Sequence, residues 1–127
     1  MVCIPCLMTG GTEIQTLNLV RALVAVGHEV VTVCYFEHDA GMVGNYETAG
    51  SKVILMSRKG ERPVGIKGTV ALLYKSFRRI LKAERPDVAH VQYMAPGAIP
   101  IIILWLLGVK RIVATAHTPA DIYPSLR

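Results

Sequence analysis

Apolar residues follow two alternating patterns along the chain. Five short, nearly continuous apolar runs are rich in β-branched residues and have the length of strands covered on both faces. They span residues 2–8, 29–36, 52–56, 87–92 and 111–116. Three longer segments repeat apolar residues with the period of an amphipathic helix, at residues 12–26, 69–83 and 96–107. Because strands and helices alternate, the pattern predicts an α/β fold with a parallel sheet.

Glycine, proline and polar residues separate these segments. We predict loops at residues 38–50, with room for one helical turn near Tyr46, and at residues 58–68. The chain, residues 1–127, is predicted to form one Rossmann-like, doubly wound domain. Residues 122–127 begin a segment that no strand or helix completes. We therefore interpret the chain as the N-terminal part of a longer protein.

Composition narrows the classes of function. The chain is 52% apolar, with a mean hydropathy of +0.42 and a formal net charge of +5, which argues against disorder. No apolar run reaches the roughly 18 residues that span a bilayer, and no basic segment typical of a secretion signal begins the chain.

Three cysteines cannot all pair, so we expect reduced thiols and a cytoplasmic location. Cys3 and Cys6 have C-x-x-C spacing, but both fall in the predicted first strand and are interpreted as core residues.

Three polar segments follow predicted strands: residues 9–13, 92–97 and 117–121. Ligands of parallel sheets bind beyond the carboxyl ends of the strands, where the strand order reverses. We therefore expect these segments to share one edge of the sheet.

The first of these segments contains a glycine turn. Gly10 and Gly11 let backbone approach a ligand closely, Thr12 is predicted to cap the following helix, and Glu13 lies in its first turn. Free amides at such a helix start bind phosphate or another anion, although a purely structural turn has the same sequence. The G-x-G-x-x-G and G-K-[ST] spacings are missing. Glu37 nevertheless follows the second strand, where a ribose-binding acid would stand, so a dinucleotide site remains an alternative.

Polar residues also follow the fourth and fifth strands. Gln92 and Tyr93 could contact a polar ligand, and His117 places a titratable group at the expected crevice. A loop histidine without a function is the plainer interpretation of His117. His90 lies inside a strand and is interpreted as a hydrogen-bonded core residue. The four histidines show no ligand spacing, so we expect no metal site.

Residues 75–82, from Lys75 to Lys82, are basic and amphipathic. The plainer interpretation is the solvated face of a helix packed on the sheet. The alternative hypothesis is that these residues bind anionic lipid headgroups, which would make the protein peripheral to a membrane. Aromatic residues are not interleaved with these charges, so we expect no nucleic-acid binding.

Three stretches together resemble the N-terminal domain of GT-B glycosyltransferases of the retaining group 1, or GT4, family. The first is Gly-Gly-Thr-Glu at residues 10–13 with Gly-His-Glu-Val at residues 27–30. The second is Pro-Asp-Val-Ala-His at residues 86–90, and the third is Val-Ala-Thr-Ala-His at residues 113–117. Their order and spacing agree with the family along nearly the whole chain.

The resemblance implies a two-domain enzyme that transfers a sugar, with retention, from a nucleotide-sugar donor to a sugar or lipid-linked acceptor. It implies no cofactor and no metal, and it assigns the nucleotide pocket to a C-terminal domain that this chain lacks. This N-terminal domain would mainly recognise the acceptor, and alone it would be inactive. A non-catalytic Rossmann-like module that binds a dinucleotide or a sugar is the alternative.

The resemblance also assigns roles to residues. His117 would be the catalytic residue near the donor sugar. It places the backbone of Gly10 and Gly11 close to the donor phosphates and the acceptor. Together with the residues that follow the strands, the predicted substrate-binding residues are Gly10, Gly11, Thr12, Glu13, Gln92 and Tyr93. Gln92 stands where the family often has a second histidine, so the role of that position is open.

Overall fold

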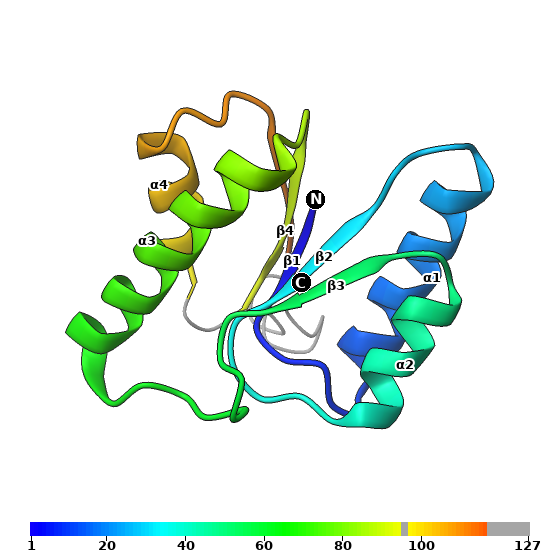
Figure 1. The fold of residues 1–127 in the computed structure, drawn as a ribbon, viewed down its shortest axis with the longest axis horizontal. Coiled ribbons are helices and arrows are strands. Elements are labelled where there is room, and N and C mark those ends of the chain that lie inside the picture. Colours follow the sequence, from blue (N-terminus) through cyan, green and yellow to red (C-terminus); the bar gives the residue numbers. More distant parts are fainter. Residues whose placement is uncertain (95–96, 117–127) are drawn as a thin grey trace, which may run out of the picture.

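The five strands of the described structure run parallel in one sheet (Figure 1). The structure is a computed structural model that describes residues 1–94 and 97–116. The strands are β1 (Val2–Ile4), β2 (Val31–Cys34), β3 (Lys52–Leu55), β4 (Ala89–Tyr93) and β5 (Ile112–Ala116). They lie in the order β3-β2-β1-β4-β5, so the first strand is central. This confirms the predicted parallel α/β fold.

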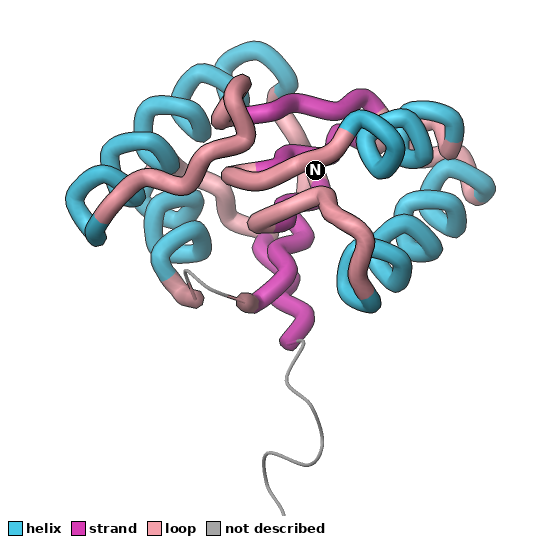
Figure 2. The backbone as a smooth tube through the Cα atoms, turned by 90° about the horizontal axis from the view of Figure 1, so that it is seen from below, coloured by secondary structure: helices cyan, strands magenta, loops and turns pink. Residues whose placement is uncertain are grey.

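Helices cover both faces of the sheet. Helices α1 (Gly11–Ala25) and α2 (Ala40–Thr48) lie on one face, and α3 (Gly65–Glu84) and α4 (Ile99–Leu106) lie on the other (Figure 1). The strands run between the two pairs of helices, as Figure 2 shows. None of the helices within residues 1–94 and 97–116 is long and apolar enough to cross a membrane.

Each sheet face carries its own buried cluster, because successive strand residues point to opposite faces. Buried side chains under α1 and α2 include Val2, Ile4, Leu17, Val20, Met42 and Tyr46. Buried side chains under α3 and α4 include Cys3, Val33, Tyr35, Leu73, Phe77 and Leu104. Counting along a strand from a residue of either cluster therefore shows which face of the sheet each later side chain occupies.

Helix α2 corrects the prediction of a loop at residues 38–50. The Asp39 side chain caps this helix by accepting a hydrogen bond from the Met42 amide at 2.8 Å. Met42 and Tyr46 are four residues apart and bury the same helical face. Burial of that face outweighs the low helix propensity of Gly41 and Gly44.

Two element boundaries also differ from the prediction. β1 ends at Ile4 rather than at residue 8, because Pro5 has no amide hydrogen to donate to the ladder. Cys6 therefore lies in the turn after the strand, not within it. α3 begins at Gly65, inside the predicted loop at residues 58–68, and the Thr69 hydroxyl supports its first turn with a 3.1 Å bond to the Gly65 carbonyl.

α3 ends at Glu84, and the residue after it is left-handed. Arg85 has φ 45° and ψ 58°, and it is the one non-glycine residue with positive φ in the part of the chain that the structure describes. Pro86 follows and cannot continue a helix. This sharp stop directs the chain into β4 at the amino end of the sheet.

Candidate functional site

The strand order reverses at one place in the sheet, between β1 and β4. From β1 the chain steps outward to β2 and β3, and α3 then carries it back across to β4 on the other side of β1. A crevice for a ligand is expected beyond the carboxyl ends of these two strands. The glycine turn follows β1 and Gln92 lies near the end of β4, so both predicted segments lie at this switch point.

The glycine turn begins α1 without a side-chain cap. Gly10 is the N-cap residue, with φ −161° and ψ 169°, and its carbonyl accepts from the Ile14 amide at 3.1 Å. The prediction that Thr12 caps the helix is therefore wrong, because Thr12 already lies inside the first turn. The amides of residues 11–13 precede the first intrahelical bond, so they remain available to an anion.

Neither glycine of this turn has a left-handed backbone conformation. A Cβ atom on Gly10 would lie 3.2 Å from both carboxylate oxygens of Glu13. A Cβ atom on Gly11 would meet no atom of the protein within 4 Å. Gly11 is also exposed, so the open space beside it can admit a ligand.

Glu13 lies behind this turn and is held by two other elements. Its side chain is 6% exposed, and the Cys6 thiol donates to Oε2 at a sulfur–oxygen distance of 3.8 Å. Its backbone carbonyl accepts a 2.6 Å hydrogen bond from the hydroxyl of buried Tyr46 in α2. Burial, and then the charge of Glu13, raise the pKa of Tyr46, so this hydroxyl keeps its proton.

Gln92 and Tyr93 occupy opposite faces of the sheet. Val2 pairs with His90, which places His90 and Gln92 on the face that α1 covers. Tyr93 lies on the α3 face, with Val91, and is 42% exposed. Gln92 is 3% exposed and lies on the α1 face, where the glycine turn also lies, whereas Tyr93 lies on the other face.

His90 is a hydrogen-bonded sheet residue, as its position predicts. Its Nε2 lies 2.6 Å from Oγ1 of Thr115 in the neighbouring strand β5. β5 ends at Ala116, which pairs with Tyr93, so its carboxyl end is at the same edge as the glycine turn. His117, the predicted catalytic residue, lies outside the described residues, as do residues 118–121.

Glu37, the candidate ribose ligand, is engaged by an arginine. Arg62 donates to both carboxylate oxygens of Glu37, from Nη2 at 3.0 Å and from Nε at 3.2 Å. The Arg62 guanidinium also stacks on Phe36, with its central carbon 4.5 Å from the ring centroid. The hydrogen bond from Arg62 lowers the pKa of Glu37. A ribose would have to displace Arg62, which disfavours the dinucleotide alternative.

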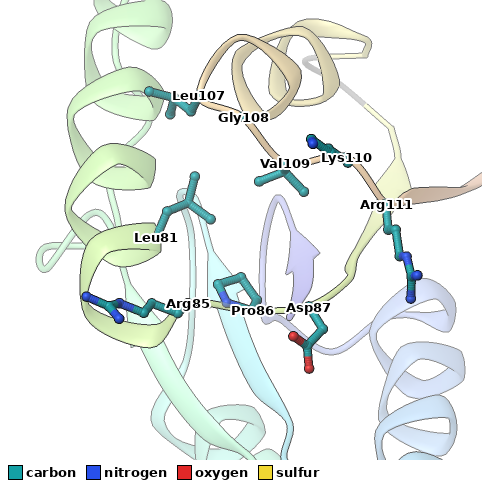
Figure 3. Close-up of a pocket in the computed structure, with 9 residues that line it drawn as sticks. All are labelled: Leu81, Arg85, Pro86, Asp87, Leu107, Gly108, Val109, Lys110 and Arg111. Atoms are coloured by element: carbon teal, nitrogen blue, oxygen red, sulfur yellow. The ribbon is translucent and has the colours of Figure 1, made fainter.

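Two hollows of the described structure lie at the opposite edge. One of about 600 Å³ is lined by residues around the ends of α3 and α4 (Figure 3). The other, of about 660 Å³, lies beside the amino ends of β1 and β4. In Figure 3 the guanidinium groups of Arg85 and Arg111 point away from one another, so these charges do not converge on a ligand. We therefore place the candidate site at the carboxyl edge, where the polar groups of the switch point gather.

A comparison with known families identifies the family of the chain. A family model described as Glycosyltransferase Family 4 matches residues 9–127. The chain belongs to this family. The match begins just before the glycine turn and includes the ends of β4 and β5. No curated protein and no solved structure matches the chain.

Family membership makes the chain a glycosyltransferase-type N-terminal domain with a Rossmann-like parallel sheet. Substrates of such a domain are a sugar donor and an acceptor. Within the described residues, no group of three or more histidine, cysteine, aspartate or glutamate side chains could hold a metal ion.

Sequence reasoning missed three residues that shape this edge: Cys6, Tyr46 and Arg62. An Asp39 cap with apolar residues at positions 42 and 46 is a helix signal that could have found Tyr46. Pro5 indicates an early strand end and hence a turn position for Cys6. Nothing in the sequence indicates that Arg62 returns to Glu37, because a 25-residue separation carries no periodic signal.

Proposed function

We propose that the chain is the acceptor-side domain of an enzyme that transfers a sugar from a nucleotide-sugar donor to a sugar or lipid-linked acceptor, with retention at the anomeric carbon. The observation that carries the proposal is the position of the glycine turn, which the family match includes, at the switch point of the sheet. There, three amides and an uncrowded Gly11 face the edge where a ligand would bind.

We propose different roles for the residues of the turn and its neighbours. The amides of residues 11–13 donate to a phosphate or hydroxyl oxygen of a substrate. Glu13 is buried behind Gly10, so we propose that it acts by holding the turn in place. Gln92 lies on the same face of the sheet and is also buried, so we propose that it supports the site rather than contacting substrate directly. His117 contacts donor or acceptor hydroxyls and stabilises charge that develops in the transition state.

A second domain would complete the enzyme. Sugar transfer requires the donor and the acceptor to be held in one geometry and shielded from water. The described edge offers one wall of such a site, so we propose that a C-terminal nucleotide-binding domain supplies the other. The 127-residue chain alone should transfer no sugar, and transfer by the purified chain would contradict this part of the proposal.

Gly11→Ala tests the proposal in the full-length enzyme. The substitution fits the folded protein and removes a flexible residue from a helix, so stability should rise by roughly 0.5–1 kcal/mol. The new methyl group would occupy the space that we assign to substrate, and kcat/KM in a nucleotide-sugar transfer assay should fall by about 100-fold.

Gly44→Ala in α2 is the matched control. A Cβ atom there also meets nothing within 4 Å, and Gly44 lies in α2, which follows β2 and neither of the switch-point strands β1 and β4. This variant should gain similar stability and keep its activity. Unchanged kcat/KM in Gly11→Ala would remove the glycine turn from the substrate site. A separate titration with NADH should show no binding, and saturable binding would favour the dinucleotide alternative.

A further inference from the structure

The helix α4 presents an apolar surface to solvent. Its sequence, Ile-Pro-Ile-Ile-Ile-Leu-Trp-Leu, contains no polar side chain. Ile103 and Leu104 are buried against the sheet, but Ile102, Trp105 and Leu106 are 53%, 66% and 65% exposed. A helix that is apolar all round is normally covered on all sides, so this face has the character of a contact surface.

The helix α3, on the same face of the sheet as α4, carries a basic outer surface. α3 buries Leu73, Phe77 and Ile80 on the sheet face that α4 also covers. The two helices lie side by side (Figures 1 and 2), and Leu81 and Leu107 line one hollow between their ends. Four exposed cations lie away from the buried face of α3: Lys75, Arg78, Arg79 and Lys82. No acidic residue occurs from position 65 to position 83.

We propose that these four cations of α3, together with Ile102, Trp105 and Leu106 of α4, form a docking surface for an anionic lipid bilayer. We call this the α3–α4 outer surface. Its cations match the negative headgroups, and its apolar side chains match the boundary between headgroups and acyl chains. A tryptophan ring, apolar with one polar N–H, is favoured at that boundary.

The charge distribution favours a bilayer over a second copy of the chain or a nucleic acid. A second copy of the chain, packed through the same surface about a two-fold axis, would gather eight cations, four from each copy, in one interface with no acidic side chain from residues 65–83 of either copy. A nucleic acid would pair with the cations but would leave the apolar side chains of α4 uncovered. An anionic bilayer satisfies both halves of the surface at once.

The fluorescence of Trp105 gives a direct test, because it is the single tryptophan of the sequence. Vesicles of equimolar phosphatidylcholine and phosphatidylglycerol should shift its emission to the blue at low salt and should pellet the protein. Vesicles of phosphatidylcholine alone should do neither, and added salt should weaken binding. Absence of both a shift and pelleting with the anionic vesicles would overturn the proposal. A blue shift that depends on protein concentration without vesicles would assign the surface to a second copy instead.

Two matched pairs of variants separate this surface from the rest of the protein. Arg78→Gln should weaken vesicle binding about fivefold, whereas Arg21→Gln, which removes an exposed charge from α1, should not. Leu106→Ser should weaken binding about tenfold, whereas Val26→Ser at the exposed end of α1 should not. Each substituted side chain is exposed, so all four variants should fold. Equal effects within each pair would show non-specific adsorption and would overturn the proposal.

Discussion

The hydroxyl of Tyr46 donates a 2.6 Å hydrogen bond to the backbone carbonyl of Glu13, across 33 residues of sequence. This bond joins α2 to the first turn of α1, the turn that carries Gly11. Tyr46 is fully buried, so its ring and its hydroxyl both contribute to holding the two helices together. A change at Tyr46 therefore reaches the candidate site through a defined contact.

Tyr46→Phe should reduce the free energy of unfolding by about 1 kcal/mol, because it removes one buried hydrogen bond and keeps the ring. Urea unfolding followed by circular dichroism measures this change. Tyr74→Phe is the control, since Tyr74 is 42% exposed on α3, and its unfolding midpoint should not move. Equal midpoints for wild type and Tyr46→Phe would mean that the bond contributes nothing to stability.

Arg62→Gln should make stability less dependent on acid pH. The hydrogen bond from Arg62 lowers the pKa of Glu37 in the folded state. A lowered carboxylate pKa contributes stability above the unfolded pKa, and this contribution is lost as the pH falls through the lowered value. Both side chains are partly exposed, so the contribution at neutral pH should stay below about 1 kcal/mol.

The measurement is the unfolding free energy of wild type and Arg62→Gln from neutral to acid pH. The two should differ at neutral pH and converge as Glu37 becomes protonated. Arg58→Gln removes a nearby exposed charge and should follow the wild-type curve. A gap between wild type and Arg62→Gln that widens toward acid pH would contradict the assignment.

The three thiols should differ in reactivity in the folded protein. Burial raises the pKa of Cys3 and of Cys34 to about 12, so almost no thiolate is present at neutral pH. Burial also raises the pKa of Cys6, but this thiol is partly exposed at the turn. Iodoacetamide labelling followed by mass spectrometry should modify Cys6 first, and Cys3 and Cys34 only after denaturant is added. Labelling of all three at one rate in the native protein would contradict the burial pattern.

His117→Ala in the full-length enzyme should lower kcat by about 100-fold or more, if the imidazole stabilises charge in the transition state. His28→Ala is the matched control, because His28 lines a hollow at the amino edge, away from the switch point. Its kcat should equal that of wild type. Similar activity in wild type and His117→Ala would assign catalysis to another group.

Much of the fold follows from the sequence because the strands β1 and β2 are buried on both faces. Continuous β-branched runs such as residues 29–36 predict a covered strand whatever the neighbours are. The alternation of strands with helices then leaves few topologies, since crossovers are right-handed and the strands must be parallel. These constraints also place the glycine turn and Gln92 at the same edge.

Predictions failed where a tertiary contact decides the local structure. α2 forms although Gly41 and Gly44 disfavour a helix, because Met42 and Tyr46 have a core to enter. The reach of Tyr46 to Glu13 depends on how α1 and α2 meet, which local periodicity does not encode. The sequence does not predict the pairing of Glu37 with Arg62 either, because this contact also depends on tertiary structure.

The backbone conformation of Arg85 suggests a way to raise the thermal stability of the protein. Its left-handed backbone is unfavourable for any residue with a Cβ atom, by about 1 kcal/mol, and glycine relieves that penalty. The residue lies at the amino end of the sheet, remote from the glycine turn. Arg85→Gly should therefore raise the melting temperature without changing the residues around a bound sugar.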